Sequence, residues 1–172
     1  LATFRAVQEA GGAQWLWNVN DGPALHHSRF APEDRELLDN AVEAALSPRP
    51  DKRSFGGLIV IGTQTLEQSL DIDADMLVTD LCPVDVLLQR IGRLHRHALP
   101  RPRDFEAPQC VVLAPEGGLH SFTAPRFENG LGMFKDASSI YANLHACELT
   151  RRLVLEHQEW IIPRMNRLLV ES

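Results

Sequence analysis

Residues Gly57 to His97 read GLIVIGTQTLEQSLDIDADMLVTDLCPVDVLLQRIGRLHRH and carry the clearest structural pattern of the chain. It predicts a strand, a polar turn, a second strand and a short helix. The two strands, residues 58–61 and 76–79, are apolar without alternation, which is typical of strands covered on both faces in a parallel sheet. A further strand at residues 110–114 continues the strand–helix–strand order, so the sequence indicates an α/β layer fold.

Residues 84–97 are expected to form one helix with opposite chemistry on its two faces. Its apolar stripe consists of Leu87, Ile91 and Leu94. Gln89, Arg93 and Arg96 repeat the same spacing two residues along, which places them on about the opposite side of the helix. The two guanidinium groups are therefore predicted to project together.

Paired arginines beside a glutamine suit the spread negative charge of a phosphate chain, and Gly92 would let another chain come close. The competing interpretation is a solvated basic helix face, which is the usual meaning of arginines at helical spacing. Spacing within this helix does not separate the two interpretations.

Three segments resemble motifs of superfamily-two helicases, and they occur in the family's order. TQTLEQSLDID (residues 63–73) and LLQRIGRLHRH (residues 87–97) resemble the fifth and sixth motifs, and LHHSRF followed by DR (residues 25–35) resembles the fourth. EQSLDID and the terminal HRH are similar to the CRISPR-associated helicase-nuclease of type I interference systems. The segments ELTRRL, EHQEW and IPRMNRLLVE are similar to that family's connector to its C-terminal domain.

The resemblance implies a RecA-like parallel sheet flanked by helices, the second lobe of a P-loop NTPase-type helicase. We expect this lobe at residues 1–125 and a helical extension at residues 126–172, which leads toward a further C-terminal domain. The implied function is that of an ATP-dependent motor on single-stranded DNA in CRISPR interference, an antiviral defence. The implied partners are that DNA, the first RecA-like lobe and nuclease domain of the same enzyme, and a CRISPR surveillance complex.

The resemblance also implies roles for residues around the nucleotide. Arg93 and Arg96 would be catalytic arginine fingers that reach a γ-phosphate on the first lobe. Gln89 would sense the nucleotide, and Asp71 would bind the ribose hydroxyl, with a turn or cap as its alternative role. Arg90 is counted with the nucleotide-binding residues, although pairing with a carboxylate of its own lobe is the favoured role.

Four residues are candidates for binding the nucleic acid: Ser28, Arg29, Thr63 and Gln64. Thr63 and Gln64 follow a predicted strand, the usual place for a site in an open α/β sheet, and their neutral donors suit a sugar-phosphate backbone. The same residue types also cap backbone groups at strand ends, so a purely structural role stays open.

Charge and cysteine content limit the classes of function. The 172 residues hold 17 Lys and Arg against 23 Asp and Glu, a formal net charge of -6, so any contact with nucleic acid must be local. The three cysteines are far apart and form neither a disulfide framework nor a zinc-ribbon spacing. No signal peptide or membrane-spanning run is recognisable, and a cytoplasmic location in a prokaryote is expected by resemblance. The first residue, Leu1, suggests a piece of a longer polypeptide.

The sequence lacks the residues that would cradle a nucleotide's phosphates. Its only lysines are Lys52 and Lys135, and neither follows a glycine, so no P-loop is present. Neither a DExx segment after a strand nor a His-Asp dipeptide of the family's nuclease occurs. The chain alone is therefore predicted to be inactive, with ATP and magnesium bound mainly by the first lobe of the complete enzyme.

No metal site is predicted. Three acidic residues alternate as at the start of an EF-hand calcium loop: Asp71, Asp73 and Asp75. The loop positions that need glycine and glutamate hold Met76 and Cys82 instead, so calcium binding is rejected. Four of the seven histidines form two pairs that assemble no third ligand by local spacing: His26 with His27, and His95 with His97.

The remaining elements are expected as follows. A helix fills residues 1–10 and stops at a glycine pair, a short strand covers residues 23–27, and Trp15 and Trp17 are expected to pack rather than stack on bases. A helix begins at Pro32 and turns these residues inward: Leu37, Leu38, Val42 and Leu46. Long helices are expected from residue 138 and from Pro163, and a mobile loop at residues 99–108.

Two rival functions remain. The chain could be a lobe of another superfamily-two RNA or DNA helicase, since EQSLDID and HRH alone favour the CRISPR enzyme. It could also be a non-catalytic α/β module that binds protein or nucleic acid without an ATP cycle. The coincidence of three motifs argues against the module.

Overall fold

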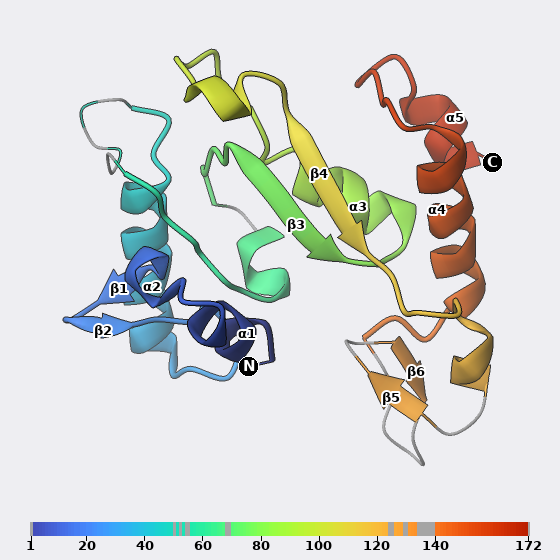
Figure 1. Ribbon diagram of the computed structural model, residues 1–172, viewed down its shortest axis with the longest axis horizontal. Coiled ribbons are helices and arrows are strands. Elements are labelled where there is room, and N and C mark those ends of the chain that lie inside the picture. Colours follow the sequence, from blue (N-terminus) through green and yellow to red (C-terminus); the bar gives the residue numbers. More distant parts are fainter. Residues whose placement is uncertain are drawn as a thin grey trace. The chain divides into compact units, whose positions relative to one another are not determined.

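The computed structural model of the chain describes residues 2–49, 51, 53, 56–67, 70–123, 126–128, 131–133 and 140–171 (Figure 1). The chain divides into two compact units that interleave in sequence. Unit 1 comprises Leu1–Asp75 and Arg93–Ala107, and unit 2 comprises Met76–Gly92 and Pro108–Ser172. The predicted boundary between residues 125 and 126 stays a prediction.

Unit 1 is built from short elements around one long helix. These are α1 (Ala2–Glu9), a 3-10 turn at Ala13–Trp15, β1 (Asn18–Val19), β2 (Gly22–Pro23), α2 (Pro32–Ala45), and 3-10 turns at Gln64–Glu67 and Arg103–Phe105. β1 and β2 pair antiparallel. Of the strand expected at residues 23–27, Pro23 lies in β2 and His26 makes an isolated bridge. α1 ends as predicted, because Gly11 turns with φ of +77° and the N–H of Gly12 donates to the carbonyl of Val7.

The start of α2 agrees with the prediction, and one of its expected inward residues does not. Pro32 occupies the first turn, where its absent N–H costs nothing. Leu38 and Val42, four residues apart, are buried, but Leu37 is 45% exposed. Since each residue rotates about 100° around a helix, Leu37 lies beside the buried stripe rather than within it.

The core of unit 1 gathers apolar side chains from α2 and from the segments around it: Trp17, Leu38, Val42, Leu70 and Ile72. Packing is therefore confirmed for Trp17. Trp15 is 46% exposed, and one side of its ring lies over Gly57, where a Cβ would come within 2.8 Å of it.

The strand predicted at residues 58–61 is not a regular strand. The chain there makes single parallel bridges, Leu16 with Ile59 and His26 with Gly62. The segments that pair with residues 58–62 belong to the first 30 residues and are irregular. Hydrogen bonds therefore form at isolated points and not along a ladder.

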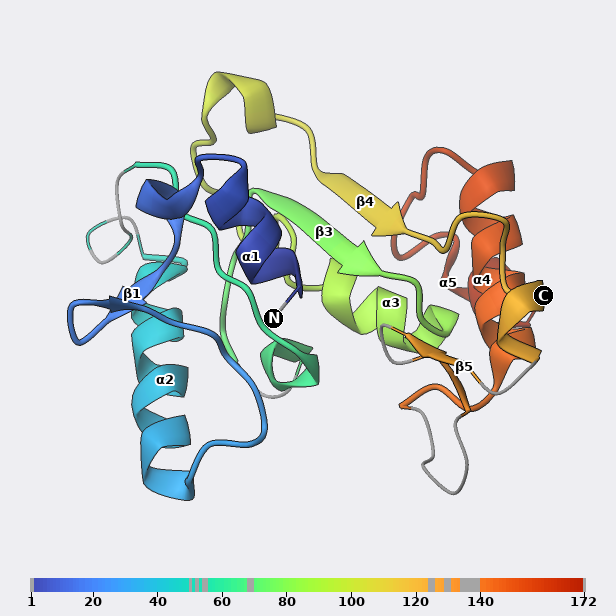
Figure 2. The ribbon, with the colours of Figure 1, turned by 60° about the horizontal axis from the view of Figure 1, so that its bottom comes forward.

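Unit 2 holds the parallel sheet and the C-terminal helices. Its elements are β3 (Met76–Asp80), α3 (Val84–Ile91), β4 (Gln109–Leu113), a 3-10 turn at His120–Thr123, β5 (Arg126–Glu128), β6 (Leu131–Met133), α4 (Leu144–Glu156) and α5 (Asn166–Glu171). β3 and β4 pair in parallel from Met76 opposite Gln109 to Asp80 opposite Leu113, which confirms the predicted α/β class. Figure 2 shows α3 along one face of this pair.

The expectation that both faces of the sheet are covered is wrong within the described residues of unit 2. Alternate side chains of the two strands are exposed: Met76, Val78, Val111 and Leu113. α3 and the core of unit 2 lie on the other side, so burial in β3 and β4 alternates with a period of two. That core consists of Leu81, Leu119, Phe122, Leu131 and Cys147.

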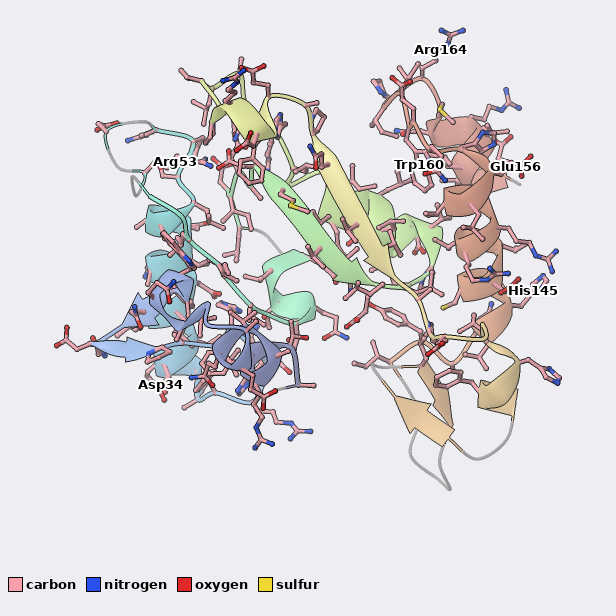
Figure 3. The ribbon with its side chains drawn as sticks, viewed as in Figure 1. Asp34, Arg53, His145, Glu156, Trp160 and Arg164 are labelled. Atoms are coloured by element: carbon pink, nitrogen blue, oxygen red, sulfur yellow. The ribbon has the colours of Figure 1, made fainter. Side chains whose placement is uncertain are left out.

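The C-terminal helices start later than predicted. α4 begins after Asn143, whose side-chain oxygen accepts a hydrogen bond from the N–H of Ala146, whereas the predicted start at residue 138 lies outside the described residues. Ile140 precedes the helix and is 58% exposed. α5 begins after the turn that contains Pro163, and Arg164 in this turn points away from both helices (Figure 3). In the part of the chain that the structure describes, no helix could span a membrane.

Candidate nucleotide and nucleic-acid site

The helix predicted over residues 84–97 ends at Ile91, so Gln89, Arg93 and Arg96 do not share a helix face as predicted. After Gly92 the chain pairs with Ala74, whose N–H donates to the carbonyl of Arg93 at 2.8 Å and whose carbonyl accepts from the N–H of His95 at 3.0 Å. These long-range bonds take the place of the helical ones. We call residues 93–101 the arginine segment.

Arg93 is a partly buried cation with an unused donor. Its Nη2 donates to the carbonyl of Glu67 at 3.1 Å, while its buried Nε has no hydrogen-bond partner among the residues that the structure describes. Burial lowers the pKa of Arg93, the charge of Arg96 lowers it further, and Asp71 acts in the opposite direction. Arg96 thus acts on the charge of Arg93, although the two side chains do not share a helix.

Asp71 lies beside the arginine segment. One oxygen of its exposed carboxylate is 3.5 Å from Nη1 of Arg96 and 3.3 Å from Nε2 of His97. Its backbone N–H donates to the carboxylate of Glu43 at 2.9 Å. The bridge between Ala74 and Leu94 therefore brings the predicted ribose ligand and the predicted fingers to one place.

A buried ion cluster next to this place was not foreseen. Asp73 is completely buried and accepts a hydrogen bond of 2.6 Å from Nη2 of Arg101, whose side chain is only 6% exposed. Asp75 pairs with Arg101 and with Arg53, which lies on the loop after α2 (Figure 3). The prediction of a mobile loop is therefore wrong at Arg101. The signal in the sequence was the set of alternating acidic residues ahead of the arginine-rich run, which indicates ion pairs. The comparison with a calcium loop considered these acidic residues only as metal ligands.

Arg90 is used within unit 2. Its Nη1 donates to the hydroxyl of Thr79 and to the carbonyl of Asp80, and its Nη2 donates to the hydroxyl of Tyr141 at 2.7 Å. Burial raises the pKa of Asp80, and the charge of Arg90 acts to lower it. Arg90 thus contacts hydroxyl and carbonyl oxygens of its own unit, and its expected pairing with a carboxylate stays a prediction. Its role toward the nucleotide stays a prediction, as does that of Gln89, which is exposed on α3.

The four candidate nucleic-acid residues come from two segments that the structure joins. The N–H of Thr63 donates to the carbonyl of His26 at 2.9 Å, next to the bridge between His26 and Gly62. Ser28, Arg29 and Thr63 are exposed, and Gln64 begins a 3-10 turn. The fourth-motif and fifth-motif segments therefore present these side chains from one part of unit 1, and their roles stay predictions.

His26 is a buried link between the two segments, which sequence reasoning considered only as a metal ligand. Its Nε2 donates to the carboxylate of Asp39 at 2.6 Å, and its Nδ1 shares a hydrogen bond with the hydroxyl of Thr65. The side chain is fully buried. Among the described residues no group of three His, Cys, Asp or Glu could hold a metal ion, and the prediction of no metal site stays a prediction.

Comparisons with known proteins identify the family and the fold of the chain. The sequence model of the family described as "CRISPR-associated nuclease/helicase Cas3, C-terminal" matches residues 2–99. The CRISPR-associated endonuclease/helicase Cas3 of Thermus thermophilus is 42% identical over 117 residues, which are 65% of this chain and 12% of that protein. The chain therefore spans about an eighth of the length of this relative.

Solved structures show the same fold. The crystal structure of T. fusca Cas3 superimposes with a TM-score of 0.73 at 27% identity, over 98% of this chain and 18% of that one. The crystal structure of T. fusca Cas3-ATP gives a TM-score of 0.68 at 30% identity, over 85% of this chain and 16% of that one. Because the family's sequence model covers more than half of the residues, the chain belongs to the Cas3 C-terminal family and has the fold of its RecA-like C-terminal helicase lobe.

Proposed function

We propose that the chain is the second motor lobe of an ATP-dependent translocase or helicase that moves on single-stranded DNA in CRISPR interference. The observation that carries the proposal is Arg93, a partly buried guanidinium with an unused Nε beside the like charge of Arg96. In this proposal both arginines are catalytic fingers of a longer enzyme. The lobe proper is residues 1–125, and residues 126–172 lead toward the next domain.

The surroundings of Arg93 suit an anionic ligand. A buried donor without a partner costs free energy, and two adjacent guanidinium groups repel each other. A phosphate group would remove both costs, since its oxygens accept from several N–H groups and its charge neutralises the pair. ATP would supply the γ-phosphoryl group, and Arg93 and Arg96 would stabilise the charge that grows on it in the transition state.

Asp71 has the chemistry of a ribose ligand. Its carboxylate is 57% exposed, and it can accept a hydrogen bond from a sugar hydroxyl while it stays near Arg96. Gln89 and Arg90 are the remaining nucleotide-binding residues of the proposal. Arg90 would act indirectly, through the contacts that hold the conformation of unit 2. ATP and magnesium would be bound mainly by the first lobe. The T. fusca relative supports the choice of ATP as the nucleotide, because one of its crystal structures is that of Cas3-ATP.

The DNA path would include the exposed side chains of Ser28, Arg29 and Thr63, with Gln64 next to them. Their donors suit phosphate and sugar oxygens, which fix a strand without reading its sequence. The proposed partners are single-stranded DNA, the first lobe and nuclease domain of the same enzyme, and a CRISPR surveillance complex. A cytoplasmic location fits these partners.

The decisive experiment replaces each finger by alanine in the complete enzyme and measures DNA-stimulated ATP turnover. We expect Arg93→Ala and Arg96→Ala to lower turnover by roughly 10³- to 10⁵-fold, the effect of losing an arginine finger. Arg93→Lys should rescue poorly, because an ammonium group lacks the planar fork. The control is Arg103→Ala, since Arg103 is exposed in its 3-10 turn. Turnover of Arg93→Ala at the rate of this control would favour a binding module without an ATP cycle.

A second experiment tests the lone chain. We expect no ATP hydrolysis above background in the presence of single-stranded DNA, because the chain carries proposed fingers and no P-loop. Turnover that survives repurification would contradict the proposed division of labour between the lobes.

A further inference from the structure

Asp73 and Arg101 form a closed link at the far end of the arginine segment. Oδ1 of Asp73 accepts from Nη2 of Arg101 at 2.6 Å, and Oδ2 accepts from the backbone N–H of His97 at 2.9 Å. The same Nη2 also donates to the carbonyl of His97 at 3.0 Å. One buried carboxylate therefore fixes both the backbone of the segment at His97 and the side chain that closes it at Arg101.

Asp75 extends this link to a four-membered ion cluster. Its two oxygens accept from Nη1 of Arg101 and Nη2 of Arg53, each at 2.8 Å. Arg53 also donates from Nη1 to the carbonyl of Asp73 at 2.8 Å, and Nε2 of His95 hydrogen-bonds the carbonyl of Asp75 at 3.0 Å. Two carboxylates and two guanidinium groups thus balance in charge, with Asp73 fully buried.

The cluster is anchored to the core of unit 1. The N–H of Asp73 donates to the carbonyl of Leu46 at 3.0 Å, at the end of α2. The bonds between Ala74 and the backbone of Arg93 and His95 hold the near end of the arginine segment, and the ion cluster holds its far end. Arg93 belongs to the near fixed point, and Arg96 lies between His95 and His97, whose backbones are both fixed.

Such a cluster is suited to fixing a conformation more than to raising stability. The free energy of removing two charges from water offsets most of their attraction, so a buried ion pair contributes little net stability, while it penalises arrangements that leave a charge unpaired. The planar fork of Arg101 contacts Asp73 and Asp75 through two donors in a fixed geometry, which the point charge of an ammonium group does not reproduce. Burial lowers the pKa of Arg101, but the hydrogen bonds to both carboxylates outweigh it and raise that pKa.

We infer that Arg101 and Asp73 are positioning residues, which hold residues 93–97 in their non-helical conformation so that Arg93 and Arg96 stay aimed at their anionic target. The inference rests on the proposed function for its catalytic consequence. Its structural part, the fixing of the arginine segment, stands on the contacts alone.

The experiment compares Arg101→Ala, Arg101→Lys and Arg53→Ala in the complete enzyme. Arg53 is the matched control, because it contacts the same two aspartates as Arg101. The contacts of Arg53 described above reach the carbonyl of Asp73 and the carboxylate of Asp75 and do not involve residues 93–101. Hydrogen exchange of peptides that cover residues 93–99 is measured beside ATP turnover. We expect Arg101→Ala to speed this exchange and to lower turnover by at least about tenfold, with less than about threefold change in either for Arg53→Ala.

If Arg101→Ala does not fold, Arg101→Lys takes its place in the experiment, since lysine keeps the positive charge and lacks the forked guanidinium group. It should loosen the segment less than alanine does and should still lower turnover more than Arg53→Ala. Equal effects of Arg53→Ala and Arg101→Lys on exchange of residues 93–99 would overturn the inference, because the cluster would then act only on general stability.

A combined variant separates this inference from the proposed function. If Arg101 acts through the two fingers, adding Arg101→Lys to the variant with both Arg93→Ala and Arg96→Ala should not slow turnover further. Losses that multiply would contradict that route. If Arg93→Ala itself has no effect on turnover, the finger proposal fails, and faster exchange in Arg101→Lys would still support the positioning role.

Discussion

Two arginines three residues apart have opposite surroundings, although they belong to one motif. Arg90, on α3 in unit 2, donates to three oxygens of its own unit. Arg93, at the start of the arginine segment in unit 1, donates to one carbonyl and leaves its buried Nε without a partner among the described residues. The difference indicates that Arg90 serves the fold and that Arg93 is left available for a ligand.

The backbones of the two regions differ in the same way. α3 is held by local helical bonds, and Leu87 lies in its buried face. The arginine segment is held by bonds to residues about 20 positions away, such as Ala74 and Asp73. The backbone hydrogen bonds of the helix are local, whereas those of the segment need distant partners, so substitutions should affect the two regions by different routes.

The largest effect on stability should come from Arg90→Ala. It removes a charged donor and leaves the hydroxyls of Thr79 and Tyr141 without it, which we expect to cost about 3 kcal/mol in unit 2. Hydrogen exchange of β3 amides in the complete enzyme would then be roughly a hundredfold faster. Arg93→Ala should change the stability of unit 1 by less than ~1 kcal/mol. Equal losses of stability in the two variants would contradict the difference between Arg90 and Arg93.

A smaller loss is expected from His26→Phe, which keeps the ring volume and removes both side-chain hydrogen bonds. The carboxylate of Asp39 loses this partner, and the hydroxyl of Thr65 keeps only its bond to the backbone carbonyl of residue 26, at a cost of about 2 kcal/mol. Exchange should rise at Thr63 and in the 3-10 turn that follows it. His27→Ala is the control, since His27 stacks on Phe30 at 4.2 Å outside this link. No change in His26→Phe would mean that the histidine only fills space.

The smallest effect concerns Glu148 on α4. Hydrogen bonds from Arg151 and Arg152 lower its pKa from 4.5 to about 2. A lowered carboxyl pKa stabilises the folded state above the unfolded value, so the contribution should be present above pH 4.5 and be lost as the pH falls toward 2. The stability difference between wild type and Glu148→Gln, followed by exchange of α4 amides, should shrink over this range. The difference should be small because these groups are close to solvent.

The control for this titration is Glu156→Gln, at the exposed last turn of the same helix. A stability difference for Glu148→Gln that stayed constant from pH 6 to pH 2, within roughly the precision of such exchange data, would contradict the role of the two arginines.

Local signals in the sequence predicted the parts of the fold that local physics decides. Pro32 marked the start of α2, the glycine pair after α1 marked its end, and the apolar run at residues 76–79 marked β3. The motifs identified the fold class, which the parallel pairing of β3 with β4 confirms.

The parts that depend on distant residues were not predictable in this way. Periodicity continues past Gly92, so nothing local shows that Ala74 draws the chain out of the helix. Arg101 stands in a run rich in proline and arginine that is typical of a loop, and its burial follows only from Asp73 and Asp75. His26 gave no periodic signal, because its partners come from α2 and from a 3-10 turn.

The availability of Arg93 for the reacting phosphate is tested most directly by comparing two ligands of the complete enzyme. ATP represents the ground state, and ADP with aluminium fluoride resembles the phosphoryl group in transfer. We expect Arg93→Ala to weaken binding of the transition-state mimic by about 10³-fold and of ATP by less than about tenfold, because a finger acts on charge that develops during the reaction. Equal weakening of both ligands, or of neither, would contradict the assignment of Arg93 as an arginine finger.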